Sequence, residues 1–151
     1  MARMKVNVYL TPPFLMISVE GIPVRLPWRR VKGRFLTVRD GSVVSRREVI
    51  AGVVSNVPPE AEAWLIVQPG QEAGYWPQCG LPAGQASFQA LAHFGGSGTE
   101  DIGEGFGLLL TLASKEASNF FRIFQAKESS RGLRELPEGT RTLDQVRVIR
   151  R

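Results

Sequence analysis

Short apolar runs separated by turn-forming residues recur along this chain, and this spacing limits what it can fold into. Turn signals such as Asp40-Gly41 and Pro58-Pro59 stand between runs at intervals of roughly ten residues. In several runs apolar and polar residues alternate, which is the period-2 pattern of a half-buried strand. The sequence therefore predicts a mainly β fold, with strands over residues 4–10, 14–19, 22–26, 34–38, 47–57, 63–69, 86–93, 104–112 and 142–149.

One segment, residues 114–128, breaks the strand pattern and predicts a helix. Ser114 stands at the expected N-cap and Glu116 in the first turn, where each favours helix initiation. We expect a core-facing stripe on this helix, with one apolar residue outside the stripe. The apolar residues at helical spacing are Ala117, Phe120, Phe121 and Phe124. The fold is therefore expected to be β-rich with one inserted helix.

Size and cysteine content favour a single compact core in a reducing setting. A chain of 151 residues can bury most of its apolar surface without disulfides. Cys79 is its only cysteine, so an intramolecular disulfide and a thiolate metal cluster are both excluded. The N-terminal residues lack the apolar stretch of a secretory signal, and no run reaches the ~20 residues of a transmembrane helix. We expect a cytoplasmic protein without a transmembrane segment.

Charge is distributed unevenly, with basic ends and an acidic middle. Residues 1–47 hold ten Lys or Arg against two acidic residues, whereas residues 48–139 hold five against eleven. Such asymmetry indicates either an anionic partner for the basic part or basic termini that lie across the acidic body of the same molecule. The sequence leaves both interpretations open.

A set of short motifs resembles a family of bacterial immunoglobulin-like β-sandwich modules. The motifs span roughly residues 34–149 and read DGSVV (40–44), VIAG (49–52), AWLIVQP (63–69), YWPQ (75–78) and AHFG (92–95). The resemblance implies an immunoglobulin-like antiparallel β-sandwich over residues 34–151. Residues 1–33 lie outside the family pattern, and their strand candidates predict an N-terminal β extension. The resemblance also implies that Trp64 anchors the core between the two sheets.

The same resemblance implies a function without catalysis. Modules of this family resemble accessory units attached to signalling, defence or envelope proteins. We therefore expect a protein-protein interaction module, acting as an accessory or structural subunit of a larger bacterial assembly. Its partner would be another protein or a second copy of the chain.

Two aromatic residues, Tyr75 and Trp76, are candidates for a partner-binding site. They follow a Gly-containing loop, and Pro77 holds the chain extended after them. We expect Pro77 and one ring to seal the sandwich, while the other ring is free to act as an interaction anchor.

A second candidate surface is the basic segment around Trp28, Arg29 and Arg30. Arg beside Trp is a common hot-spot composition in protein interfaces, so protein binding ranks first. The alternative is an adaptor for nucleic acid or an anionic membrane surface, because arginines neutralise phosphates and a Trp can stack on a base. No motif of a known nucleic-acid-binding fold accompanies the segment.

Residues for catalysis or cofactor binding are sparse. Cys79 and His93 form the only nucleophile and base pair that could support a small hydrolase, and they lie in no recognisable signature. The glycine-rich stretch 95–99 lacks the Lys of a phosphate loop and precedes acidic residues, so a hairpin loop is expected there. We expect no catalytic residues, no metal site and no cofactor.

Overall fold

The computed structural model describes residues 6–11, 14–19, 22–25, 30–70, 74–82 and 84–151, and up to residue 25 only the course of the backbone. Three antiparallel strands, β1 (Val6–Thr11), β2 (Phe14–Val19) and β3 (Ile22–Arg25), form a small sheet with no strand from the rest of the described chain. The strands predicted over 4–10, 14–19 and 22–26 are confirmed where the structure describes them, and residues 4, 5 and 26 lie outside the described residues.

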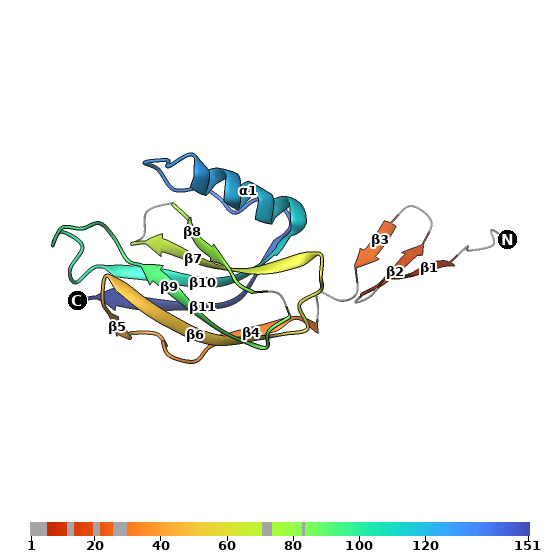
Figure 1. The fold of residues 1–151 in the computed structure, drawn as a ribbon, viewed down its shortest axis with the longest axis horizontal. Coiled ribbons are helices and arrows are strands. Elements are labelled where there is room, and N and C mark those ends of the chain that lie inside the picture. Colours follow the sequence, from red (N-terminus) through yellow and green to blue (C-terminus); the bar gives the residue numbers. More distant parts are fainter. Residues whose placement is uncertain (1–5, 12–13, 20–21, 26–29, 71–73, 83) are drawn as a thin grey trace.

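The body of the protein is built from two facing sheets (Figure 1). The larger has the order β5-β11-β10-β7-β8 and the smaller the order β4-β6-β9. Their bounds are β4 (Lys32–Phe35), β5 (Val43–Val44), β6 (Arg47–Ser55), β7 (Ala61–Pro69), β8 (Trp76–Gly80), β9 (Ser87–His93), β10 (Gly105–Ser114) and β11 (Thr140–Arg150). The mainly β prediction is confirmed, whereas β8 is a strand that the sequence pattern did not predict.

The main core lies between the two sheets and follows from strand periodicity. Alternate residues of the small sheet, such as Ile50 and Phe88, point inward to meet Leu65, Leu108 and Leu110 of the large sheet. These side chains are almost fully removed from water, and their burial is the main stabilising contribution to the fold. Val31 also belongs to this core, so the body begins a few residues before the predicted boundary at residue 34.

The one α-helix of the described residues, α1 (Lys115–Ala126), lies over the outer face of the large sheet (Figure 1). It begins where predicted, because the Ser114 hydroxyl accepts a hydrogen bond from the Ala117 amide at 3.2 Å. Phe121 is fully buried and Phe120 is exposed, so Phe120 is the apolar residue that lies outside the core-facing stripe. The helix prediction is confirmed.

The position predicted for Trp64 was wrong. The side chain is buried, but it lies under α1 with Ile66, Leu109 and Phe121 instead of between the two sheets. Its indole N–H donates to the Ser118 hydroxyl at 3.0 Å. The reason is that α1 buries the outer face of β7 as well, so both faces of this strand are apolar.

Two loops also bear on the sequence predictions. The turn at Asp40-Gly41 is present, with Gly41 at a positive φ of 84° that glycine adopts without strain. The stretch 95–99 is not a hairpin loop, because it connects β9 of the small sheet to β10 of the large sheet. That prediction was wrong, and the crossing between sheets shapes the site described next.

Candidate functional site

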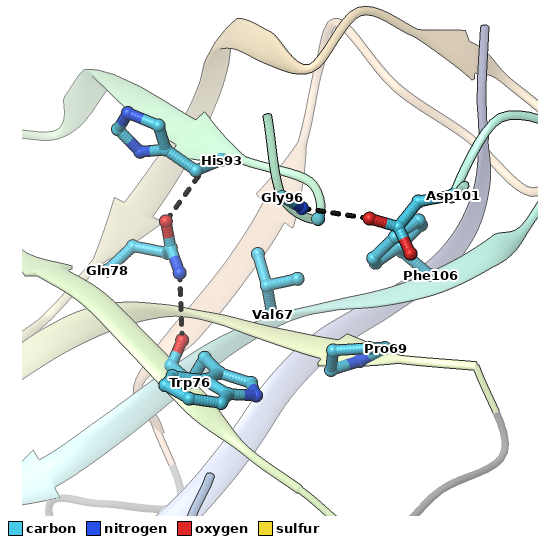
Figure 2. Close-up of a pocket in the computed structure, with 9 residues that line it drawn as sticks. Val67, Pro69, Trp76, Gln78, His93, Gly96, Asp101 and Phe106 are labelled. Carbon is cyan, nitrogen blue, oxygen red and sulfur yellow. Dashed lines mark hydrogen bonds between the residues drawn. The ribbon is translucent and has the colours of Figure 1, made fainter. Parts of the chain in front are cut away.

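A pocket of about 410 Å³ opens between the two sheets at the end of β9 (Figure 2). Its apolar lining comes from Val67, Pro69, Trp76 and Phe106. Its polar lining comes from Gln78, His93, Asp101 and the backbone of Gly95 and Gly96. This volume falls at the low end of the range of small-molecule and side-chain sites, which are mostly apolar with a few polar groups.

The pocket exists because β8 and β9 are edge strands of different sheets. β8 pairs with β7 and β9 pairs with β6, so in the described chain no strand closes the gap between them. One side chain spans the gap instead: the Gln78 amide accepts from the His93 N–H at 3.0 Å and donates to the Trp76 carbonyl at 3.1 Å. Figure 2 shows this bridge at the rim of the pocket.

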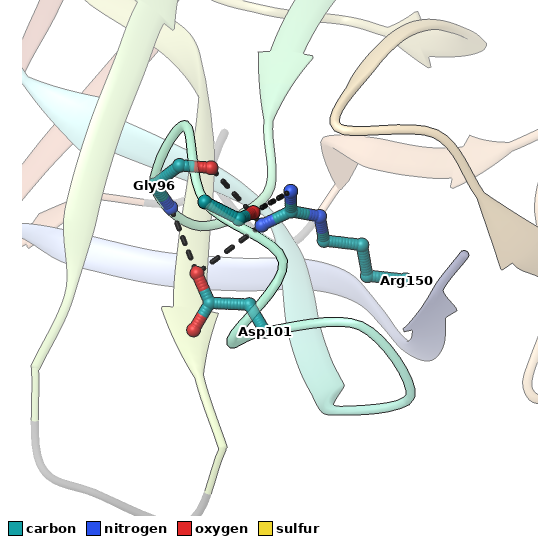
Figure 3. Close-up of polar contacts among 4 residues, drawn as sticks. Gly96, Asp101 and Arg150 are labelled. Atoms are coloured by element: carbon teal, nitrogen blue, oxygen red, sulfur yellow. Dashed lines mark hydrogen bonds and ion pairs between the residues drawn. The ribbon is translucent and has the colours of Figure 1, made fainter.

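A buried arginine fixes the loop that forms another wall of the pocket (Figure 3). Arg150 donates to the carbonyls of Gly96 and Gly98 at 3.1 and 2.8 Å and to the Asp101 carboxylate at 3.2 Å. The same carboxylate accepts from the Gly96 N–H at 2.8 Å. Charged groups give the stronger protein hydrogen bonds, so this network holds the loop in one shape.

The outer edge of β9 carries backbone groups that pair with no other strand of the described chain. The Val54 N–H donates to the Ala86 carbonyl and the Phe94 N–H to the Arg46 carbonyl, so even-numbered residues of β9 face β6. Odd-numbered residues point the other way, because hydrogen-bonding direction alternates along an antiparallel pair. The His93 N–H meets Gln78, which leaves the N–H and C=O groups of Ser87, Gln89 and Leu91 directed at the open side.

The edge of β8 is protected by the chain's own residues. The Gln125 amide of α1 donates to the carbonyls of Pro77 and Gln78 at 3.0 and 2.8 Å. Next to them, Tyr75 and Leu133 exchange two backbone hydrogen bonds. This edge therefore cannot take another strand without losing these contacts.

The other outer edges of the two facing sheets are protected by known devices. β5 is only two residues long, and β4 carries the exposed Lys32 and Arg34. Short edge strands and charged side chains are two of the means by which proteins prevent edge pairing. From Ser87 to His93, β9 has no Pro, no Asp, Glu, Lys or Arg, and its register with β6 shows no bulge.

An exposed apolar cluster lies on the outer face of the small sheet. Val49 and Leu91 are direct cross-strand partners, and Leu36 is hydrogen-bonded through its N–H to the Ala51 carbonyl nearby. All three side chains are exposed. We call Leu36, Val49 and Leu91 the outer apolar cluster.

Basic residues lie at two ends of the outer apolar cluster. Lys32 and Arg34 of β4 alternate with inward-facing residues, so they point to the same outer face. Arg47 is exposed at the start of β6, opposite His93. The outer face is thus apolar at its centre and positively charged at two ends.

The structure separates the two sets of predicted partner-binding residues. Trp76 is half-buried, lines the pocket and packs edge-on against Phe124 with ring centroids 6.2 Å apart. Tyr75 is half-buried against the apolar cluster between α1 and the large sheet, which includes Trp64 and Phe121. Arg30 is exposed two residues before β4. It lies at the opposite end of the sandwich, because Lys32 pairs with the last residue of β6.

Trp28 and Arg29 lie outside the described residues. The partner-binding role of all five residues stays a prediction. Sequence reasoning missed Arg150, Gln78 and the odd-numbered edge of β9, whose roles depend on strand order. The one available signal was the absence of charge and proline over residues 87–93.

Cys79 and His93 differ in their surroundings. Cys79 packs against the main core, and burial raises the pKa of its thiol above the ordinary value. His93 is exposed at the pocket rim. A nucleophilic cysteine needs a depressed pKa, because the thiolate is the reacting form.

We expect the Cys79 thiol to be alkylated by iodoacetamide at pH 8 at least severalfold more slowly than a free cysteine. The raised pKa also makes stability pH-dependent: its contribution is full below the ordinary thiol pKa and is lost as the pH rises through the raised value. Cys79→Ala should therefore flatten the fall in urea midpoint between pH 8 and 10. Alkylation faster than free cysteine would contradict this expectation.

The described chain offers neither a metal-ligand cluster nor a membrane-spanning helix. Within the described ranges, no three His, Cys, Asp or Glu side chains gather as metal ligands would. The one helix of the described chain is too short and too polar to cross a bilayer.

No family model, curated protein or solved structure matches the chain. Function is therefore inferred from the chemistry of the pocket, the β9 edge and the outer face.

Proposed function

We propose that this chain is an immunoglobulin-like β-sandwich that acts as a non-enzymatic protein-protein interaction module, an accessory or structural subunit of a cytoplasmic assembly. Strand order supports the immunoglobulin-like assignment. β4, β6 and β9 follow the order A-B-E of such domains, and β11, β10 and β7 follow the order G-F-C. The helix α1 is then an insertion between strands F and G.

The observation that carries the proposed function is the outer apolar cluster. The outer face of the large sheet is covered by α1, whereas the small sheet has no helix over the same kind of face in the described chain. Leu36, Val49 and Leu91 are each about half exposed there. Contiguous exposed apolar groups with a polar rim are typical of protein-binding surfaces.

Charge defines the chemistry of the partner. Lys32, Arg34 and Arg47 lie at two ends of the cluster, and the basic segment with Trp28, Arg29 and Arg30 directly precedes β4 in the sequence. A partner with an apolar centre and acidic residues at its rim would complement this face, because opposite potentials steer association and set orientation. The predicted hot-spot residues of the N-terminal segment would extend the same interface.

The absence of catalysis is part of the proposal and has its own support. The only cysteine is partly buried with a raised pKa, and burial disfavours the thiolate that a hydrolase would need. The pocket offers a single histidine with no described carboxylate bonded to it. A binding role needs only the apolar pocket and the open strand edge, without a reactive side chain.

A matched pair of surface variants tests the proposal. Val49 and Ile123 are equally exposed, at 56% and 55%, but Val49 lies on the small sheet and Ile123 on α1. A photo-crosslinking amino acid placed at Leu36 in living cells would identify the partner. Val49→Arg should then weaken the purified complex at least tenfold, since it adds a charge to a buried contact, while Ile123→Arg should leave the affinity within about twofold.

Salt separates this proposal from the adaptor alternative. Binding to phosphates falls steeply with salt because condensed counterions are released. A protein interface centred on the apolar cluster should persist at 0.5 M NaCl. Recovery of only nucleic acid or anionic vesicles, at low salt and dependent on residues 1–30, would contradict the proposed function.

A further inference from the structure

We propose that β9 receives an extended segment of the partner polypeptide as an added strand, and that the pocket beside it holds one large apolar side chain of that segment. This inference rests on the proposed protein-binding function and names the class of ligand. The ligand is a backbone in β conformation with an aromatic or long aliphatic residue at one position.

The open edge of β9 specifies a backbone ligand. The N–H and C=O groups of Ser87, Gln89 and Leu91 alternate along a straight, bulge-free strand at the spacing that another strand offers. Added strands bind through these main-chain groups, which supply affinity without regard to sequence. Strand addition to β9 would place the partner next to Leu91 of the outer apolar cluster.

Among the edges of the two facing sheets, the contrast with the others makes β9 the site. The β8 edge is occupied by Gln125 and Leu133, the β5 strand has two residues, and the β4 edge is charged. An unprotected edge is a liability, because it promotes aggregation. A sandwich that protects its other edges and leaves β9 open is consistent with an edge kept for binding.

The pocket supplies the side-chain selectivity that an edge lacks. Val67, Pro69 and Phe106 form an apolar interior, and the Trp76 indole lines one side (Figure 2). Asp101 is already paired with Arg150, so it adds no free charge to attract a cation. An aromatic side chain suits this lining, since it gains apolar burial and ring contacts together.

Two observations place the pocket in reach of an added strand. His93 is at once the last residue of β9 and part of the pocket lining. Gln78 occupies the His93 N–H, so pairing ends there and the following residues of the added segment meet the pocket. Alternate residues of a strand point to the same side, so one side chain per two residues is directed inward.

The experiment uses the intact chain and a phage-displayed library of random nonapeptides. Enriched peptides should lack proline at the pairing positions and carry a large apolar residue at one fixed position. Resynthesis with N-methyl groups on alternate amides should reduce affinity at least tenfold for one of the two methylation patterns, and exchange of the large apolar residue for Asp should reduce it at least tenfold.

A variant of the edge provides the complementary test. Gln89→Pro removes an N–H that points away from β6, so the β6–β9 pairing is kept, but the ring blocks an incoming strand. Peptide affinity should fall at least tenfold, and the melting temperature should stay within a few degrees. Gln89→Ala is the matched control and should bind the peptides as the parent chain does.

Each other outcome counts against strand addition. No enrichment, or peptides that bind equally after both methylation patterns or to Gln89→Pro, would overturn it. A concentration-dependent dimer that Gln89→Pro abolishes would assign the edge to a second copy and would also overturn it. If the photo-crosslinked partner is lost with Val49→Arg but retained by Gln89→Pro, the interaction module stands and only the added strand is wrong.

Discussion

Phe121→Ala is expected to destabilise the protein by about 3 to 5 kcal/mol, the range for removing a fully buried aromatic side chain. Phe121 is 0% exposed and its ring centroid lies 5.1 Å from that of Trp64, in a tilted contact. Its removal opens a cavity between α1 and the large sheet. For a chain of this length the melting temperature should fall by roughly 10 °C, measurable by circular dichroism.

The neighbouring residue supplies the control. Phe120 is 46% exposed on the same helix, so Phe120→Ala should change stability by less than about 1 kcal/mol. Trp64 fluorescence should shift to longer wavelength with Phe121→Ala only. Equal losses in the two variants would show that α1 contacts the sheet through a different face.

The helix illustrates how far local sequence carries a prediction. Ser114 and the spacing of the phenylalanines define where α1 begins and which residues are apolar. They do not say which of two adjacent phenylalanines is buried, because that depends on how the helix is rotated over β7 and β10. The same missing information placed Trp64 on the wrong face of its strand.

Strands were predictable wherever turn residues flank an alternating run, as in β6 and β9. β8 was missed because Pro77 and the glycines around it read as a loop. Its pairing with β7 includes a register shift next to Leu65, a bulge that accommodates the proline. Strand order was harder to predict than the strands themselves, because contacts between distant segments decide which edges are open.

The pocket depends on such distant contacts. Arg150 and Asp101 are 49 positions apart in the sequence, and neither stands out among the charged residues of the chain. They meet because β10 and β11 pair directly and bring the end of β11 beside the loop before β10. A sequence pattern could show an acidic glycine-rich loop there, but not the arginine that fixes it.

Arg150→Met is expected to destabilise the protein by about 1.5 to 3 kcal/mol, the range for hydrogen bonds to a charged group. The Arg150 side chain is only 5% exposed, and its loss leaves the Gly96 and Gly98 carbonyls without this donor and Asp101 with the Gly96 N–H. The loss of stability should be smaller than that for a fully buried ion pair, because Asp101 is 38% exposed and water can replace part of the interaction.

Arg150→Met should affect the loop around Glu100 more strongly than it affects the stability of the whole protein. Glutamyl endopeptidase should cleave after Glu100 at least tenfold faster in Arg150→Met, since the loop loses the contacts that hold it closed. Arg147→Met is the matched control on the same strand: Arg147 is exposed, with one 3.3 Å hydrogen bond to the Gly70 carbonyl, and its loss should cost less than about 1 kcal/mol.

Peptides that need the pocket should bind Arg150→Met weakly and Arg147→Met normally, because the wall that Arg150 fixes is the one that encloses the bound side chain. Normal peptide binding by Arg150→Met, together with rapid cleavage after Glu100, would show that the loop takes no part in recognition.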